Sequence, residues 1–198
     1  MDYYLLLRLG HIAGFILLGG GLLAVFVSEL RAHATDDVHV FAEAAWYTAI
    51  FYDTLVLPGA LLLGLSGLLL IFELGLGFFE EPWLFGMWGL FLFEFVEGNT
   101  ITRIEYRRTL RQSRKALAEA HLTPELRNQA RKTLGRFTHF LDVPLFAVIV
   151  YCGVMRPTAW GHVIIAILIA VALAAALTFV APRLVRLWST GEGFRRPT

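Results

Sequence analysis

Long apolar runs separated by short polar stretches dominate the chain. A helix needs roughly 20 mainly apolar residues to cross a hydrocarbon core about 30 Å thick. Five stretches reach or approach this length, and they cover about residues 4–27, 54–76, 83–102, 140–155 and 160–180. The pattern therefore predicts an all-α fold. We expect a single integral membrane domain over residues 1–198, a polytopic bundle of about five transmembrane helices arranged as a four-helix core plus one.

The polar stretches between these runs predict two further features. Residues 33–52 are polar at first and then aromatic-rich, which indicates an inward extension or an interfacial helix leading into the second span. Residues 103–136 carry ten Lys and Arg residues. Within them, Thr123-Pro124-Glu125 indicates a turn and a new helix start, so we expect a loop of two helical pieces. Pro144 and Pro157 delimit the short fourth span.

The basic residues set the predicted topology. Lys and Arg next to transmembrane ends stay on the cytoplasmic side, so the basic loop 103–136 is expected in the cytoplasm. The N-terminus is then outside, and the tail with Arg183 and Arg186 returns to the cytoplasm. We expect a bacterial-type inner (plasma) membrane. A second interpretation of the loop is binding to anionic lipid or to a partner.

Composition agrees with a membrane protein whose first partner is the lipid bilayer. Hydrophobic residues make up 57% of the chain, against about 45–50% in soluble domains. The net charge of +1 gives no general attraction to nucleic acid, and no nucleic-acid partner is expected.

The single cysteine, Cys152, excludes a disulfide framework and is expected to be a small buried hydrophobe. No basic n-region or cleavage site marks a signal peptide, so the first apolar run is expected to stay as a helix.

Ionisable residues inside the spans are the candidate functional groups. Such residues are costly in a membrane and usually face the bundle interior or a cavity. The predicted topology sorts them into two layers. The outer layer holds His11, Glu73 and His162. The inner layer holds His33, Asp53, Glu94, Glu97, Arg103, His139 and Asp142.

The inner layer contains two pairs with helical spacing. Glu94 and Glu97 are three residues apart and share a helix face, and so do His139 and Asp142. One interpretation is a proton-handling or metal site. The other is a buried lattice of salt bridges from the two glutamates to Arg103 or Arg136. No ligand-spacing rule singles out this pattern as a metal signature.

His11 is the sharper candidate in the outer layer, with His162 as the other candidate cofactor-binding histidine. A neutral imidazole on an apolar helix can ligate haem iron, with the porphyrin between helices. The following Gly14 and Gly19–Gly21 give room for a flat ligand or allow close approach of another helix. The alternative role of His11 is a hydrogen bond to a neighbouring helix.

Several motifs together resemble small membrane proteins of the HemJ-type protoporphyrinogen oxidase and CopD-like group. The first helix, with His11-Ile12 followed by glycines, is similar to that family's Leu/Phe-His-Ile motif and its later Gly-Gly or Ala-Gly. Arg31–Ala34 is similar to a His-Ala after the first helix, and Leu57–Gly59 to a Thr-Pro-Gly. Residues 137–144 resemble a Phe-Arg-x-x-Asn-Glu-x-Pro pattern, with Asp142 in place of the Glu.

The resemblance implies haem b in the membrane, with His11 as the leading metal ligand, and a redox or porphyrin-handling role. The chain departs from the enzyme at three positions. Met87 stands where the enzyme has a Lys, Thr138 where it has an Arg, and Leu141 where it has an Asn. The resemblance therefore predicts a divergent relative, with an oxidoreductase activity of that type left open and the catalytic residues unknown.

Two other functions stay open. One is a non-catalytic accessory subunit of a larger respiratory or photosynthetic membrane complex, or a homo-oligomer, with the basic loop as a docking element. The other is a transporter that uses the inner carboxylates, although no inverted repeat is apparent between the two halves. No glycine loop suitable for phosphate is present, since Gly19–Gly21 lies within a span and lacks the following Lys-Ser/Thr.

Overall fold

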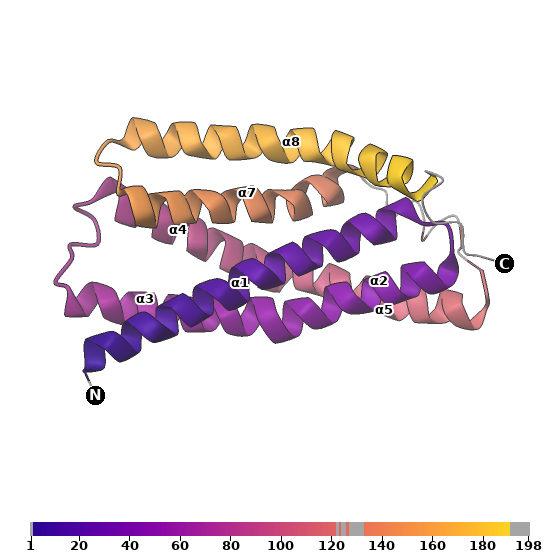
Figure 1. The fold of residues 1–198 in the computed structure, drawn as a ribbon, viewed down its shortest axis with the longest axis horizontal. Coiled ribbons are helices and arrows are strands. Elements are labelled where there is room, and N and C mark those ends of the chain that lie inside the picture. Colours follow the sequence, from indigo (N-terminus) through magenta and orange to yellow (C-terminus); the bar gives the residue numbers. More distant parts are fainter. Residues whose placement is uncertain (1, 122, 124–125, 127–132, 191–198) are drawn as a thin grey trace.

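The protein is described here from a computed structural model that covers residues 2–121, 123, 126 and 133–190. The described part is helical and contains no strand. The helices of the described part run alternately in opposite directions along one long axis (Figure 1). This arrangement confirms the expected polytopic helical bundle.

The first two rods form a hairpin. Helix α1 spans Tyr3–Ala34, and Asp37 then caps the N-terminus of α2, Val38–Phe51, by accepting hydrogen bonds from two backbone N–H groups. A π-helical turn, η1, Tyr52–Val56, joins α2 to α3, Leu57–Glu73, without a break. Residues 38–73 therefore form one rod, which shows that the aromatic-rich stretch is a helical extension of the second span.

The third rod repeats this construction. Helix α4, Pro82–Glu97, continues through a second π-helical turn, η2, Gly98–Thr102, into α5, Arg103–Ala118. Helix α5 is thus the first of the two helical pieces expected in the basic loop. The predicted turn at Thr123-Pro124-Glu125 and the second piece fall mainly outside the described residues.

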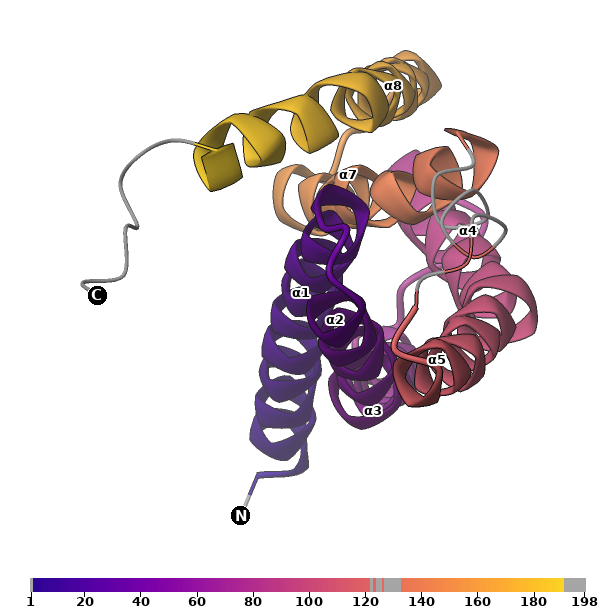
Figure 2. The same cartoon turned by 90° about the vertical axis from the view of Figure 1, so that its right-hand side faces the viewer.

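The last two rods are α7, Thr133–Met155, and α8, Trp160–Thr190. Pro144 lies inside α7 and does not delimit it. A proline in a membrane helix is tolerated because neighbouring helices and local adjustment satisfy the freed backbone groups. Helix α8 packs mainly on α7 and lies outside the group formed by the other rods (Figure 2), in agreement with a four-helix core plus one.

Four helices of the described part are long and apolar enough to cross a membrane. They are Tyr3–Ala34, Val38–Glu73, Phe137–Met155 and Trp160–Ala181. Helix α4 has 16 residues and carries two glutamates near its end, yet it packs lengthwise on α7 in the same bundle. A fifth crossing, by α4, stays a prediction.

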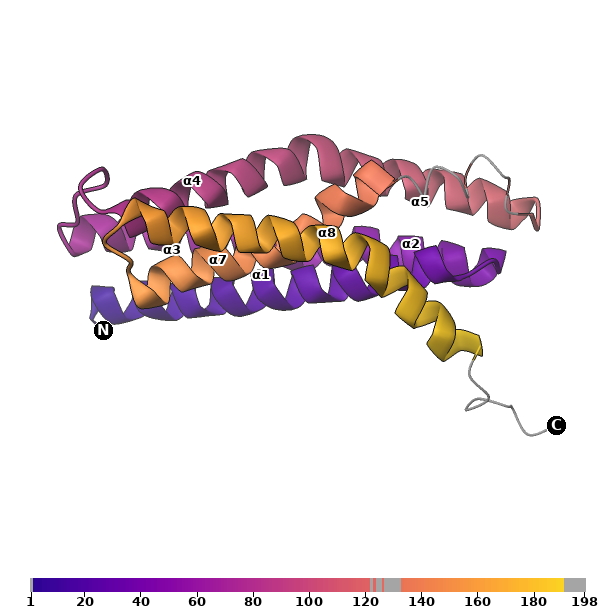
Figure 3. The same ribbon diagram turned by 90° about the horizontal axis from the view of Figure 1, so that it is seen from above.

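Surface and length fit a membrane environment. Leu168 and Ile169 of α8 are each 62% exposed, and similar apolar side chains cover the same helix. The 32 residues of α1 span about 48 Å at 1.5 Å per residue, more than a hydrocarbon core of about 30 Å. The bundle is therefore longer than a bilayer core. The α1–α2 turn and α5 lie at one end, called the α5 end below, and the start of α1 lies at the other (Figure 3).

Glycines set how closely the first two rods approach. A Cβ added to Gly14 would lie 2.5 Å from the Leu63 backbone nitrogen, and one added to Gly59 would lie 2.5 Å from that of Leu18. A Cβ added to Gly21 would lie similarly close to atoms of η1, whereas one added to Gly20 would meet no neighbouring atom. Most of these glycines therefore serve close helix packing, and none of them lines the cavity described next.

Candidate functional site

The half of the bundle away from α5 contains a cavity of about 340 Å³, called the main cavity below. Its volume falls in the usual range of about 300–1,000 Å³ for small-molecule and cofactor sites. Helices α1, α3, α4 and α7 each supply part of its wall. The lining residues are His11, Ile12, Phe15, Leu63, Gly64, Gly67, Met87, Trp88, Phe91, Phe146, Ile149, Val150, Gly153 and Val154.

The main cavity has an apolar wall and a lateral opening. His11 is the one ionisable side chain among the described residues that line it. Phe15 and Phe146 stack with ring centroids 5.5 Å apart, and Trp88 meets Phe91 edge to face. Ile12, Phe15 and Val154 are exposed. Since the exposed lining residues lie on α1 and α7, the cavity opens between these two helices toward the apolar surroundings of the bundle.

His11 has a polar partner on α3. Its Nδ1 lies 3.3 Å from the hydroxyl oxygen of Ser66, and that hydroxyl donates to the backbone carbonyl of Leu62, one turn earlier on the same helix. In the tautomer that carries the proton on Nδ1, this atom donates to the Ser66 oxygen and Nε2 keeps its lone pair, which is the state of a histidine that ligates a metal. The ring rests against Gly67, where a Cβ would lie 3.1 Å from His11 Cε1.

His162, the other predicted cofactor-binding histidine, lies elsewhere. It is exposed in the first turn of α8, and it does not line the main cavity. Glu73 is exposed at the end of α3. The outer layer of the sequence analysis therefore contributes one residue, His11, to the cavity.

The inner layer is centred on an ion pair between α1 and α7. His139 Nδ1 lies 2.6 Å from Glu29 Oε1, and His139 Nε2 lies 3.4 Å from Glu105 Oε2. The His139 ring also contacts the ring of Tyr106, with centroids 5.0 Å apart. Glu29 is 7% exposed, so the pair is removed from solvent. His33 is buried one turn beyond Glu29 on the same helix, against the ring of Phe140.

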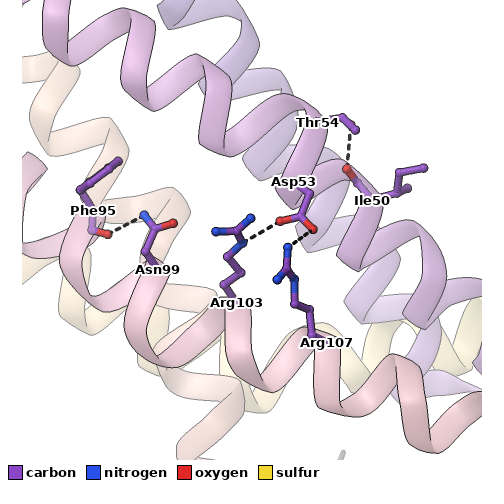
Figure 4. A network of polar contacts seen from close by, with 7 residues as sticks. All are labelled: Ile50, Asp53, Thr54, Phe95, Asn99, Arg103 and Arg107. Carbon is purple, nitrogen blue, oxygen red and sulfur yellow. Dashed lines mark hydrogen bonds and ion pairs between the residues drawn. The ribbon is translucent and has the colours of Figure 1, made fainter.

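A second set of ion pairs joins the two rods that contain π-helical turns (Figure 4). Asp53, in η1, accepts a hydrogen bond from Arg103 Nε at 2.7 Å and another from Arg107 Nη2 at 2.9 Å. Arg103 follows η2 directly. π-Helical turns often occur at functional sites, and here both lie at the level of the buried polar groups. Arg103 thus pairs with Asp53, and not with Glu94 or Glu97 as one interpretation expected; the Arg136 side chain is outside the described residues.

The two predicted pairs of the inner layer separate in the structure. Thr102 donates to Glu97 at 3.0 Å. Glu94 and Asp142 of α7 line a second cavity of about 50 Å³, called the small cavity, together with Tyr52. His139 turns to Glu29, so the four residues do not converge on one point.

The structure gives no support for a metal site built from the inner layer. Within the described ranges, no group of three or more His, Cys, Asp and Glu side chains is arranged to hold a metal ion. That result concerns sites made of several protein ligands. A haem iron needs only one or two, so the prediction for His11 is not affected.

Sequence reasoning missed Glu29, Glu105 and Tyr106. A signal for Glu29 was available, because it continues the buried stripe of Leu18, Leu22 and Val25 at spacings of four, three and four residues. For Glu105 the sequence gives no comparable signal, since it lies among arginines on a charged helix. Its contact with His139 depends only on how the two helices pack in the folded protein.

Comparisons with known proteins identify the family. Residues 5–157 match the family described as "predicted integral membrane protein (DUF2269)", and the chain belongs to it. No curated protein and no solved structure matches the chain. The family description agrees with the membrane bundle and says nothing of a ligand. A relationship to the HemJ-type or CopD-like group stays a prediction.

Proposed function

We propose that this integral membrane protein binds haem b in the main cavity, where His11 would ligate the iron, and has a redox or porphyrin-handling role. The observation that carries the proposal is the position of His11 in an otherwise apolar cavity, with Nδ1 3.3 Å from the Ser66 oxygen. A proton on Nδ1 leaves the Nε2 lone pair available for a metal. The motifs that resemble HemJ-type and CopD-like proteins support the same ligand.

The cavity wall suits a flat, mainly apolar group. Gly64 and Gly67 let the rings of Phe91 and His11 lie close to α3, and Trp88 and Phe91 add aromatic rings to the lining. Met87, at the position where the HemJ-type enzyme has a Lys, adds an apolar contact. When bound, haem would supply one-electron chemistry. The chain's own groups would hold the macrocycle, orient His11 through Ser66 and exclude water.

The lateral opening supports entry from the bilayer. Ile12 and Phe15 on α1 and Val154 on α7 are exposed and apolar, so a hydrophobic ligand meets no polar barrier between lipid and cavity. A porphyrin dissolved in the membrane therefore fits this route better than a water-soluble substrate does.

An absorption spectrum tests the proposal. The protein is purified in mild detergent from haem-replete cells, and the wild type, His11→Ala and His162→Ala are compared at equal concentration. We expect a Soret band in the wild type and in His162→Ala, and its loss or strong reduction in His11→Ala. A colourless wild type, or an unchanged band in a folded His11→Ala protein, would refute haem ligation by His11.

A second candidate is a non-catalytic accessory subunit of a larger membrane complex. It is favoured by one face of α5, on which Arg107, Arg108, Arg111 and Arg114 are exposed. A basic face can dock on an acidic surface of a partner protein. Purification in mild detergent with larger subunits, together with no effect of His11→Ala in cells, would favour this candidate over haem binding.

A further inference from the structure

Helix α5 has a buried face and an exposed basic face. Tyr106, Ser113 and Ala116 are buried against the rest of the bundle. The exposed basic residues of the helix are Arg107, Arg108, Arg111, Arg114 and Lys115. They recur at spacings of three and four residues, which places their side chains along one side of the helix. This side, called the basic stripe below, faces away from the other helices.

The basic stripe has little compensation of its charge within the protein. Arg107 Nη2 lies 2.9 Å from Asp53 Oδ2. The described residues form no ion pair with the other members of the stripe. Glu105 is the acidic residue of α5, and its carboxylate contacts α7 instead. The stripe is therefore an unbalanced positive surface, which the net charge of +1 for the whole chain conceals.

The basic stripe begins just beyond the apolar part of its rod. Helices α4 and η2 together extend about 31 Å at 1.5 Å per residue, which is close to the thickness of a hydrocarbon core. Arg107 and Arg108 follow about 8–9 Å past Thr102, and Arg111 about 14 Å past it. The headgroup region adds about 5–8 Å on each side of the core, and charge acts over a further Debye length of about 8 Å. Most of the stripe is thus within reach of headgroup charge.

Two other rods place the membrane surface at the same end. In α2, which runs antiparallel to α5 beside it, Trp46 and Tyr47 are exposed. Trp46 lies about 10 Å beyond Asp53 toward the α5 end, beside the basic stripe in height. Trp and Tyr prefer the membrane–water interface. In α8 the apolar span Trp160–Ala181 is followed by the exposed Arg183. Aromatic and basic side chains of three rods therefore mark one interfacial layer.

We propose that the basic stripe of α5 binds the headgroups of anionic phospholipids. A guanidinium group donates several N–H groups in a planar fork that matches the oxygens of a phosphate. Topology requires only that basic residues lie near the end of a span. The structure adds their alignment on one exposed and uncompensated side, and such clusters next to membrane helices attract anionic lipid.

A lipid fits this surface better than an acidic protein does. The stripe begins at the height of the headgroups, where lipid surrounds any membrane-spanning bundle. The basic and aromatic side chains of this layer are also spread over several rods, as contact with a continuous membrane surface requires. Lipid binding at the α5 end involves none of the residues that line the main cavity. The proposal is therefore independent of haem.

Native mass spectrometry of the purified protein in mild detergent tests the proposal. The protein is titrated separately with phosphatidylglycerol and with phosphatidylcholine of the same acyl chains, and the association constants of the first bound lipid are compared. Both lipids contain a phosphate, but phosphatidylglycerol alone has a net negative charge. We expect the wild type to prefer phosphatidylglycerol. The preference should fall at least about tenfold in Arg108→Gln/Arg111→Gln/Arg114→Gln, since each basic residue near an anionic surface contributes roughly fivefold.

Two control variants separate charge from other effects. Arg108→Lys/Arg111→Lys/Arg114→Lys keeps the charge and should keep most of the preference. Arg8→Gln removes an exposed arginine at the opposite end of the bundle and should bind both lipids like the wild type. The substituted side chains are exposed, and circular dichroism checks that each variant folds. A higher concentration of ammonium acetate should weaken the preference of the wild type and leave that of the glutamine variant unchanged.

The results that would overturn the proposal are distinct from those that concern haem. A wild type that binds the two lipids equally would overturn it, and so would an equal preference in the wild type and the folded glutamine variant. If the glutamine variant keeps the lipid preference but loses a co-purifying subunit, the stripe is a protein-docking face and the proposal is wrong. The Soret band enters none of these comparisons.

Discussion

Replacement of Gly14 by alanine should separate α1 from α3. The new Cβ would lie 2.5 Å from the Leu63 nitrogen and 2.8 Å from its Cα. Ordinary contacts between such atoms are about 3.5–4.0 Å. Because the contacted atoms belong to the backbone of α3, no side chain can rotate away, and the two rods must part by about 1 Å.

The expected cost follows from this separation. Overpacking a tight interface costs about 1–3 kcal/mol, and backbone contact puts Gly14→Ala in the upper part of that range. A gap of about 1 Å also removes up to half of the dispersion energy of neighbouring contacts. For a chain of this size, each kcal/mol corresponds to roughly 2–4 °C in Tm, so we expect a decrease of roughly 4–12 °C.

The assay is thermal unfolding of the purified protein in detergent, followed by the fluorescence of its five tryptophans. Gly20→Ala is the matched control on the same helix, because a Cβ at Gly20 meets nothing within 4 Å. Alanine favours a helix over glycine by up to about 1 kcal/mol, so this control should unfold at an equal or higher temperature. If Gly14→Ala and Gly20→Ala unfold at the same temperature, the close approach of α1 and α3 is refuted.

Three further changes test individual contacts. Ser66→Ala removes the polar partner of His11 Nδ1, and we expect haem affinity to fall by about 10–100-fold in a titration with haem, while the Tm changes little. Asp53→Asn removes two partly exposed ion pairs and should cost about 1 kcal/mol in thermal unfolding, with a smaller effect at high salt; an effect independent of salt would contradict this reasoning. Glu29→Gln weakens a buried charged hydrogen bond and should cost about 1–3 kcal/mol, and its effect should not add to that of His139→Gln; strict additivity would show that the two side chains do not interact.

The sequence was sufficient for the rods of the bundle because their signal is local. Apolar runs of membrane length predict where α1, α3, α7 and α8 lie, and the basic residues after Thr102 mark where the apolar part of the third rod ends. The fourth span was predicted over about residues 140–155, and the helix that contains it, α7, begins earlier, at Thr133. Pro144 lies inside this helix, because neighbouring helices and local adjustment satisfy the freed backbone groups.

The site was only partly predictable, because its partners come from distant parts of the chain. His11 stands out locally as an ionisable residue in an apolar run. Its partner Ser66 is 55 residues away, and Glu29 is 110 residues from His139. Spacing placed Glu94 with Glu97 and His139 with Asp142, but helical spacing only puts side chains on the same side. Which neighbour each one meets depends on the crossing of the rods: Glu97 accepts a hydrogen bond from Thr102, whereas Glu94 lines the small cavity together with Asp142.

The two π-helical turns have a consequence for the history of the chain. In each, a backbone N–H bonds to the carbonyl five residues earlier, from Leu57 to Tyr52 and from Arg103 to Gly98. Each turn thus holds one residue more than a regular helix and absorbs what would otherwise rotate the rest of the rod by about 100°. Loss of one residue within a π-helical turn would therefore restore a regular helix and leave the two ends of the rod in register. We expect family members that lack the Asp53–Arg103 pair to be one residue shorter in one or both of these places, with the rest of each rod unchanged.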